Sequence, residues 1–338
     1  MRAVIADSPG PPDVLRPVNL LDDGPAAGQV VVAVEACAVT FVETQIRAGV
    51  VPPPPGTSFP LVLGNGVGGT VLAVGDGVES ERWLGARVVT STGGRGGYAS
   101  RARAAVTDLH GVEAGLALHD ALALLADGRT AVGLSRAANP GGNDVVVVTA
   151  AAGGVGGLLV QLAAGRGATV VGLASNDAKL ARARELGAAA TIGYTSAGWL
   201  AELDRVAPGG VDVVFDGVGG DTGGALLERL APGARYVAHG FASGRWATPD
   251  ESALARRGVT VVPLSSVATA GRAGWELTET ALAEAAAGRL RPTIGQTYPL
   301  EQASRAHAAI EARAAIGKTL LLPGPADVQN ATAALTSW

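Results

Sequence analysis

The stretch 145-VVVVTAAAGGVGGLLVQLAAGRGATVVGLAS-175 decides the fold of this chain. Four valines predict a short buried strand, small residues and glycines follow, and an apolar pattern then continues as a helix. A second apolar strand, 169–174, comes next. This order of strand, glycine turn, helix and strand is typical of a dinucleotide-binding unit.

The glycine turn has the spacing of the phosphate-binding fingerprint. G-x-G-x-x-G falls on Ala151, Gly153 and Gly156, with alanine in the first place. Gly153 would let the backbone approach a pyrophosphate, and Gly156 would allow close contact between helix and strand. The free N–H groups of the helix that starts near Gly154 would bind the phosphates. The alternative interpretation is a glycine turn that serves packing alone.

The end of the second strand bears on the choice between NAD and NADP. An acidic residue about 20 positions after the fingerprint would bind the ribose 2′-hydroxyl. Here the strand ends in the neutral residues 174–176, and Lys179 follows in the next helical turn. Asp177 is explained by its place in the first turn of a helix. The pattern favours NADPH, with a solvated helix residue as the alternative for Lys179.

The chain as a whole suggests two domains, because 338 residues are many for one core. Short apolar runs bounded by turn residues predict antiparallel β structure up to about residue 118. Strands then alternate with helices, which predicts a parallel, doubly wound sheet. The tail after about 262 cannot form a core alone, so we expect it to return to the first domain. The predicted domains are 1–118 with 263–338, and 119–262; residues 324–338 are expected to be disordered.

Composition narrows the class of protein. The chain is 48% hydrophobic and 17% charged, with a net charge of -4 and a single cysteine, Cys37. No apolar run reaches the ~18 to 20 residues that cross a bilayer, and the start lacks a signal-peptide pattern. One cysteine excludes an internal disulfide and a Cys-rich zinc site. Without a basic stripe we expect no nucleic-acid partner, and we predict a cytoplasmic protein with a small-molecule substrate.

Six segments, including part of the glycine-turn stretch, carry a resemblance to a known family. The chain resembles the medium-chain dehydrogenase/reductase superfamily, in its zinc-independent quinone oxidoreductase (zeta-crystallin-like) branch. The resemblance covers nearly the whole chain. The segments are VEACAVTFVETQIRAG (34–49), AAGGVGGLLVQLA (151–163), ARELGAAATIGY (183–194), VDVVFDGVGGDT (211–222), LAPGARYVAHGFASG (230–244) and HAAIEARAAIGKTLLLP (307–323).

The resemblance implies an α/β protein with a GroES-like β-rich catalytic domain and a Rossmann domain that binds NADPH. It also implies an active site in the cleft between them, and a homodimer. The pyrophosphate would lie on 153–156, the 2′-phosphate near Ser175, Lys179 and Tyr194, and the nicotinamide half near Thr130 and 240–242. The implied cofactor residues are Thr130, Ala152, Gly153, Gly154, Val155, Gly156, Ser175, Asn176, Lys179, Tyr194, Gly240, Phe241 and Ala242. Tyr194 has a packing role as its alternative.

Zinc is not expected. The zinc-dependent relatives place a cysteine where this chain has Thr40, and a His-Glu pair where it has Asn65-Gly66. Their structural zinc lobe needs four cysteines. A catalytic zinc needs three protein ligands, so the resemblance implies a metal-free enzyme.

The candidate substrate-binding stretch departs from the family. The quinone reductases commonly show Asn-Phe-x-Asp-Thr-Tyr-x-Arg-x-Gly-x-Tyr, and this chain has 40-TFVETQIRAGVV-51. Thr40 replaces the asparagine, Gln45 the first tyrosine and Val51 the second. Reduction of a quinone or an enone puts negative charge on an oxygen, which needs a donor. Thr40 and Gln45 are the candidate donors, and we expect hydride chemistry on an altered substrate.

Three functions remain open. The first is an NADPH-dependent reductase of a quinone or of an activated, α,β-unsaturated carbonyl double bond. Its variant is a stand-alone enoyl reductase, or another tailoring enzyme, of polyketide or secondary metabolism. The alternative of another class is a non-catalytic NADPH-binding protein. Consumption of NADPH separates the first from the last.

Overall fold

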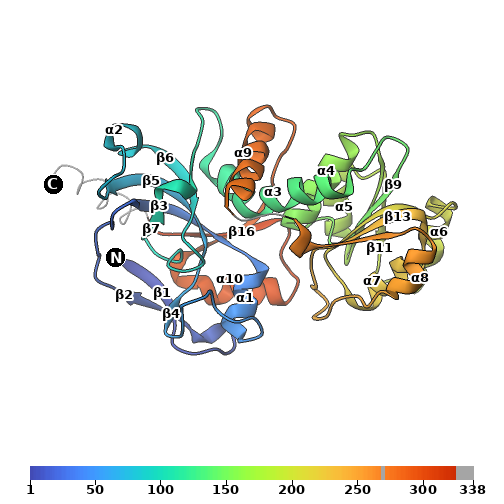
Figure 1. Cartoon of the computed structure of the whole chain (residues 1–338). Coiled ribbons are helices and arrows are strands. Elements are labelled where there is room, and N and C mark those ends of the chain that lie inside the picture. Colours follow the sequence, from blue (N-terminus) through green and yellow to red (C-terminus); the bar gives the residue numbers. More distant parts are fainter. Residues whose placement is uncertain (268–270, 325–338) are drawn as a thin grey trace. The chain divides into compact units, whose positions relative to one another are not determined.

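The computed structural model describes residues 1–267 and 271–324, and it divides the chain into two compact units (Figure 1). The second unit is Asp127–Pro292, and the first holds Met1–Ala126 with the described part of the chain from Thr293 onward. The first division falls inside helix α3 (Leu118–Ala138). The expected disorder of 324–338 lies outside the described residues, apart from Gly324.

These divisions differ from the expected positions 118 and 262. Helix α9 (Gly271–Ala286) belongs to the second unit, although the sequence suggested that it returns to the first. The reason is packing against α3. A Cβ atom on Gly133 would lie 3.2 Å from Leu277 of α9 and would overlap Val267, so this apolar helix is buried against the neighbour that it fits.

The second unit is a six-stranded, wholly parallel sheet, as predicted. Its order, β11-β10-β9-β12-β13-β14, reverses direction between β9 and β12, which is the doubly wound Rossmann order. Consecutive valines form its central strand because both faces of a parallel sheet are buried. The strands are β9 (Val145–Val148), β10 (Thr169–Ala174), β11 (Ala190–Gly193), β12 (Val211–Asp216), β13 (Leu230–Ala238) and β14 (Thr260–Pro263).

Helices connect these strands in turn. The helix predicted to start near Gly154 is α4 (Gly154–Ala164), and its inner face buries Leu158, Leu159 and Val160. Its end at Ala164 is explained by Gly165 and Gly167, which follow at once. The remaining helices are α5 (Asp177–Glu185), α6 (Trp199–Val206), α7 (Gly220–Leu227) and α8 (Glu251–Arg256).

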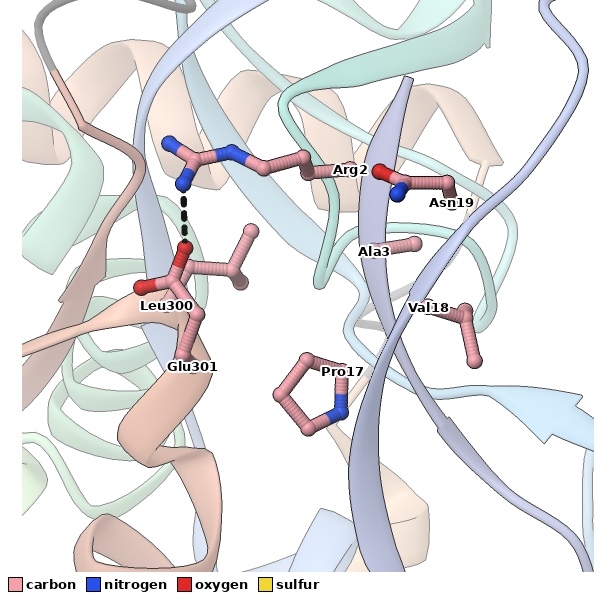
Figure 2. A pocket seen from close by; sticks show the side chains of 7 residues that line it. All are labelled: Arg2, Ala3, Pro17, Val18, Asn19, Leu300 and Glu301. Carbon is pink, nitrogen blue, oxygen red and sulfur yellow. Dashed lines mark ion pairs between the residues drawn. The ribbon is translucent and has the colours of Figure 1, made fainter.

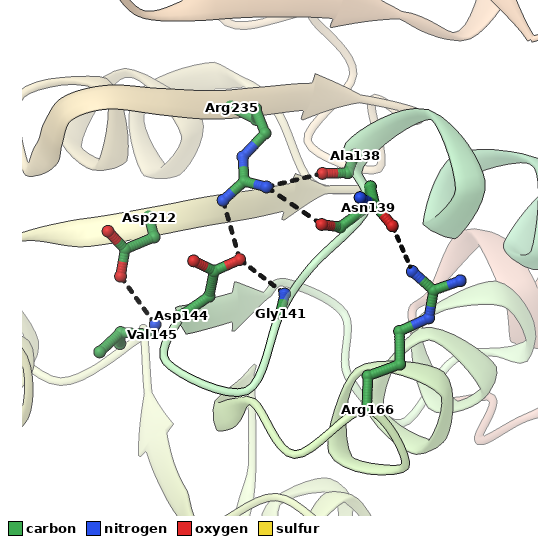
Figure 3. A network of polar contacts seen from close by, with 8 residues as sticks. All are labelled: Ala138, Asn139, Gly141, Asp144, Val145, Arg166, Asp212 and Arg235. Atoms are coloured by element: carbon green, nitrogen blue, oxygen red, sulfur yellow. Dashed lines mark hydrogen bonds and ion pairs between the residues drawn. The ribbon is translucent and has the colours of Figure 1, made fainter.

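A polar network ties down the loop that enters β9 (Figure 3). Arg235 donates to the carbonyl of Ala138 at 2.9 Å and to Asp144 at 2.8 Å. Asp144 also accepts from the backbone N–H of Gly141 at 2.8 Å. Asp212 accepts from the backbone N–H of Val145, the first residue of β9, at 2.8 Å. This network fixes the amino end of β9, and the opposite, carboxyl end carries the glycine turn.

The first unit is mainly antiparallel β structure, as predicted. A seven-stranded sheet has the order β15-β16-β3-β5-β6-β8, with β7 also pairing with β3, and a second sheet has the order β2-β1-β4. The chain after Thr293 does return here, since β16 pairs antiparallel to β3 with Leu320 opposite Ala38. The strands are β1 (Arg2–Ala6), β2 (Leu15–Asn19), β3 (Gln29–Val39), β4 (Leu61–Val62), β5 (Gly66–Val74), β6 (Arg87–Ser91), β7 (Arg101–Ala105), β8 (Leu109–Gly111), β15 (Ile294–Pro299) and β16 (Lys318–Leu322).

Besides the first part of α3, the helices α1 (Phe41–Ala48), α2 (Ser80–Trp83) and α10 (Ala303–Glu311) accompany these sheets. Helix α1 follows β3 directly and carries the candidate substrate contacts. Across 1–267 and 271–324, every helix is too short or too polar to pass through a bilayer.

Candidate functional site

The glycine turn between β9 and α4 has the geometry that its sequence predicts. Ala150 adopts a left-handed conformation with φ 49°, and its carbonyl accepts from the N–H of Gly153 at 2.8 Å. A Cβ atom on Gly156 would collide with that same carbonyl oxygen. The third position of the fingerprint therefore has to be glycine for the helix to begin this close to the strand.

The amino end of α4 can bind an anion. The N–H groups of Gly154, Val155 and Gly156 lie in the first turn, where a helix offers no carbonyl acceptor four residues earlier. Together with the helix dipole they favour negative charge. The helix is eleven residues long and opens at the point where the strand order reverses. This is the position at which doubly wound folds bind a pyrophosphate.

An acid that sequence reasoning missed lies beside this helix end. A Cβ atom on Gly154 would overlap the Asp127 carboxylate, so Gly154 is the residue that gives Asp127 room. Thr130 follows Asp127 by three positions on α3, and residues at that spacing share a helix face. The only signal in the sequence is an acid three residues before a candidate site residue. Nothing in that spacing shows that Asp127 meets α4.

The candidate 2′-phosphate residues gather where β10 and β11 end. Asn176 caps α5, since its Oδ1 accepts from the N–H of Lys179 at 3.0 Å. The N–H of Tyr194 donates to the carbonyl of Ala174 at 3.2 Å, which places Tyr194 beside the end of β10. Ser175 accepts from Thr195 through its carbonyl at 3.3 Å. Tyr194 also packs against the hydrophobic core, so a packing role and a binding role are both compatible with its position.

A buried carboxylate, that of Asp216, organises the loop at the carboxyl end of β12. Asp216 accepts from the Thr149 hydroxyl at 2.9 Å, from the N–H of Gly219 at 3.0 Å and from the Tyr236 hydroxyl. Burial raises the pKa of Tyr236, which keeps its hydroxyl protonated as a donor. Asp216 therefore holds the loop after β12 in one shape.

The segment 240–242 is held against that loop. The N–H of Ala242 donates to the carbonyl of Gly217 at 3.1 Å, and the N–H of Ser243 donates to that of Val218 at 2.8 Å. The Phe241 ring lies 5.0 Å from the Trp246 ring at an interplanar angle of 45°. The backbone of the candidate nicotinamide segment 240–242 is thus held by hydrogen bonds, and its Phe241 ring packs against Trp246.

In the first unit, α1 begins at the candidate donor Thr40. The N–H of Thr40 donates to Glu43 Oε2 at 2.7 Å, and the Thr40 side chain faces the backbone N–H of Glu43 as in a capping box. The buried Thr40 hydroxyl donates to no acceptor within the described ranges. The side-chain amide of Gln45 donates to the Thr44 hydroxyl at 3.1 Å. Thr40 is therefore the N-cap of α1 and Gln45 lies within this helix, nine and four residues before Gly49 of the exposed turn Gly49–Val50.

Glu43 anchors this helix instead of facing a substrate. Its carboxylate is buried and accepts from Thr40, from the N–H of Asn65 at 2.8 Å and from the Tyr98 hydroxyl at 3.1 Å. Burial raises the pKa of Glu43. The Tyr98 hydroxyl also lies 2.9 Å from His307 Nε2, so His307 belongs to the same buried polar group.

At the positions where the zinc-dependent relatives have their metal ligands, the side chains of this chain make other hydrogen bonds. Asn65 Oδ1 accepts from the Ser91 hydroxyl and from the N–H of Gly94, each at 2.7 Å. Burial raises the pKa of the Cys37 thiol to about 12, so no thiolate is present at neutral pH. Within 1–267 and 271–324, no three His, Cys, Asp or Glu side chains gather as a metal site would need.

Cavities in the described part of the first unit include two that no predicted site residue lines. The smaller has a volume of about 180 Å³ and lies between β1, β2 and the turn at Leu300–Glu301 (Figure 2). There Arg2 pairs with Glu301 at 2.7 Å. The larger, of about 600 Å³, contains Arg95, Arg101 and Arg103 with Asp22 and Asp23. Arg101 pairs with Asp22, so these charges largely compensate one another.

Comparisons with known proteins agree with this architecture. Residues 26–124 match the family model of the alcohol dehydrogenase GroES-like domain, and residues 186–321 match that of zinc-binding dehydrogenases. Quinone oxidoreductase of Salmonella typhimurium is 32% identical over 323 residues, which cover 93% of this chain and 97% of that protein. The 2-haloacrylate reductase of a Burkholderia species is 33% identical over 335 residues, 96% of this chain and 99% of the relative.

Solved structures show the same likeness in three dimensions. The crystal structure of Escherichia coli quinone oxidoreductase complexed with NADPH superposes with a TM-score of 0.87 at 29% identity, covering 96% of this chain and all of the other. That of 2-haloacrylate reductase gives a TM-score of 0.78 at 30% identity. The fold and the glycine turn define a dehydrogenase of the medium-chain dehydrogenase/reductase superfamily, and within it this chain belongs to the quinone oxidoreductase family.

Proposed function

We propose that this protein is an NADPH-dependent reductase that transfers a hydride to a quinone or to a double bond activated by a carbonyl group. The observation that carries the proposal is the glycine turn at α4, placed where the order of the parallel sheet reverses. Support comes from relatives named quinone oxidoreductase and 2-haloacrylate reductase, and from a neighbour solved with NADPH.

The second unit is the proposed cofactor domain. Residues 152–156 would hold the pyrophosphate through backbone N–H groups. Lys179 would supply positive charge to the 2′-phosphate, with Ser175 and Tyr194 beside it and Asn176 fixing the start of α5. The nicotinamide half would lie along the backbone segment 240–242, with Thr130 as a further contact. The amino end of α4 has no side-chain cap, and the end of β10 carries no acidic residue. Both features fit a phosphorylated dinucleotide.

The first unit is the proposed catalytic domain. Bound NADPH supplies the hydride, and the residues of the chain bind, orient and stabilise charge. Reduction places negative charge on the substrate oxygen. The proposed donors to that oxygen are the Gln45 amide and the buried Thr40 hydroxyl, which donates to no acceptor in the described part of the chain.

The proposed mechanism uses no zinc, although the matching family model is described as zinc-binding dehydrogenase. Thr40 offers a hydroxyl where a thiolate ligand would be needed, and the Asn65 side chain already accepts two hydrogen bonds. Polarisation of the substrate would then fall to neutral donors. We also propose that the protein acts in the cytoplasm. We propose further that it is a homodimer, and sedimentation of the purified protein tests this oligomeric state.

Oxidation of NADPH at 340 nm tests the function. The substrates are 1,4-benzoquinone, an α,β-unsaturated ketone and an enoyl thioester, each assayed with and without a zinc chelator. We expect turnover with at least one class, no effect of the chelator, and a decrease in kcat of at least about 10-fold in Thr40→Val if its hydroxyl meets the developing charge. Tight NADPH binding without oxidation of any class would instead favour a non-catalytic binding protein. Preference for the thioester would favour the enoyl reductase.

A further inference from the structure

The side-chain amide of Asn65 has a defined orientation in the first unit. Its Oδ1 accepts from the Ser91 hydroxyl and from the backbone N–H of Gly94, each at 2.7 Å. A backbone N–H can only donate, so the amide atom that faces Gly94 must be the oxygen and not the nitrogen. The amide nitrogen, Nδ2, therefore points away from these two donors.

The Nδ2 atom of Asn65 can be reached by a ligand. Asn65 is half-buried, and within the described ranges its Nδ2 has no hydrogen-bond partner. Nδ2 does not belong to the buried polar atoms that lack a partner there, so it keeps contact with solvent. An amide nitrogen carries two N–H groups and can only donate. The group that would bind it is therefore an acceptor, such as a carbonyl oxygen.

The surroundings of Asn65 hold this amide in place. The N–H of Thr92 donates to the carbonyl of Asn65 at 2.8 Å, which fixes the loop 91–94 to the residue that it supports. Pro54 packs on the same loop, since a Cβ atom on Gly94 would lie 2.6 Å from the Pro54 Cγ. Donors that are already oriented stabilise a developing charge most effectively, because they need no reorganisation during the reaction.

Asn65 lies beside the candidate donor Thr40. The Glu43 carboxylate accepts from both backbone N–H groups, through Oε2 from Thr40 at 2.7 Å and through Oε1 from Asn65 at 2.8 Å. This buried carboxylate thus joins the start of α1 to the residue before β5. The Thr40 side chain faces the N–H of Glu43 as an acceptor, so the proton of its hydroxyl remains available to another acceptor.

We propose that Asn65 is a catalytic residue whose Nδ2 donates a hydrogen bond to the substrate oxygen that becomes negatively charged during hydride transfer. The inference rests on the proposed function, because it needs a substrate with a carbonyl oxygen. In that step the substrate takes up the hydride, its oxygen becomes that of an enolate or a hydroquinone anion, NADPH becomes NADP⁺, and water then supplies a proton. Asn65 and Thr40 form a pair of neutral donors to this oxygen.

The test compares the wild type with three variants. Asn65→Asp keeps an acceptor for Ser91 and Gly94 but loses the N–H donor, and Asn65→Ala loses both without adding a charge. Ser91→Ala is the matched control, because it keeps the amide and removes one of the two groups that hold it. The measurements are kcat and KM with the substrate class that gives the fastest oxidation, and the Kd for NADPH by calorimetry. Thermal unfolding confirms that each variant is folded, and Asn65→Asp decides the question if Asn65→Ala does not fold.

We expect both substitutions of Asn65 to lower kcat at least about 10-fold, since a donor to the developing charge is lost. The Kd for NADPH should change less than about 2-fold, and Ser91→Ala should lower kcat less than about 3-fold. An unchanged kcat in Asn65→Asp or in folded Asn65→Ala, or an equal loss in Ser91→Ala, would overturn the inference and leave the reductase function intact. If the wild type oxidises NADPH with none of the three substrate classes, the proposed function itself falls.

Discussion

The Tyr98 hydroxyl lies 2.9 Å from His307 Nε2, a contact between residues 209 positions apart that ties α10 to the core of the first unit. The two rings meet edge to face, with centroids 5.7 Å apart and an interplanar angle of 88°. The same hydroxyl lies 3.1 Å from Glu43, which anchors α1. One phenol thus connects the helix that carries the candidate substrate donors with the returning end of the chain.

Removal of this hydroxyl should destabilise the first unit without affecting the cofactor. Tyr98→Phe leaves two buried polar groups, on Glu43 and His307, short of a partner, and we expect a loss of about 2 to 4 kcal/mol in the free energy of unfolding. Tyr298→Phe is the matched control, because the structure records no hydrogen bond for the Tyr298 hydroxyl. Urea unfolding measures both. Equal stability of the two variants would show that the Tyr98 hydroxyl contributes no net stability.

Acid should unfold the protein partly through His307. Burial, with the nearby positive charge of Arg47, lowers the pKa of His307 from 6.5 to about 3. The unfolded chain therefore binds a proton between these values that the native state does not bind. The contribution of His307 to stability is complete above pH 6.5 and is lost as the pH falls, by about 1.4 kcal/mol per pH unit.

The measurement is the free energy of unfolding from pH 7 to 4.5, for the wild type and His307→Gln. Taking the difference between the two proteins cancels the other titrating groups, including Glu43, whose raised pKa acts in the opposite sense. We expect the wild type to lose stability more steeply. Parallel profiles would mean that His307 titrates normally in the folded protein.

Gly156 should be indispensable where another helical glycine is not. In Gly156→Ala the new methyl group meets the carbonyl of Ala150, so the turn must shift and the first N–H groups of α4 move with it. We expect the Kd for NADPH to rise at least about 10-fold. Gly224→Ala in α7 is the control, because a Cβ atom there meets nothing within 4 Å. Unchanged NADPH affinity in Gly156→Ala would remove this turn from the binding site.

Asp127 should weaken the binding of the phosphates. Its carboxylate lies at Gly154, the first residue of α4, where the proposed pyrophosphate would place further negative charge. Asp127→Asn should lower the Kd for NADPH about 2- to 10-fold at low salt and less at high salt, because the repulsion is screened. Calorimetry at two ionic strengths measures this. Weaker binding in the variant would show that the carboxylate supports the turn more than it repels the ligand.

Lys179 should discriminate between the two dinucleotides. Lys179→Ala removes the positive charge proposed for the 2′-phosphate, so the Kd for NADPH should rise about 10-fold or more while that for NADH stays constant. Arg182→Ala is the control, since Arg182 is a cation of the same helix that pairs with Glu185 at 2.9 Å. A similar effect of both substitutions would point to the general field of α5 and not to a phosphate contact.

The sequence predicted the second unit well because its signals are local. The valine strand, the glycine turn and the neutral end of β10 can each be recognised within a few residues, and the predicted strand 169–174 is β10 to the residue. The compact units divide the chain at Pro292 and not at the expected position 262, because the packing of α9 depends on Gly133, which is far away in the sequence.

The sequence analysis missed other residues of the candidate site because their contacts join distant segments of the chain. Asp127 meets Gly154 across 27 positions, and the partners of Glu43, namely Asn65 and Tyr98, come from two other segments.

Detection of hydride transfer is the most direct test of the proposed reductase function. The measurement is mass spectrometry of the product formed from NADPH that carries deuterium at C4 of the nicotinamide, with the substrate class that gives the fastest oxidation. For an enone or an enoyl thioester, we expect one deuterium at the β-carbon of the product when the transferred face is labelled and none when the opposite face is labelled. Binding of NADPH with no deuterated product from either label, over all three substrate classes, would contradict the assignment as a reductase.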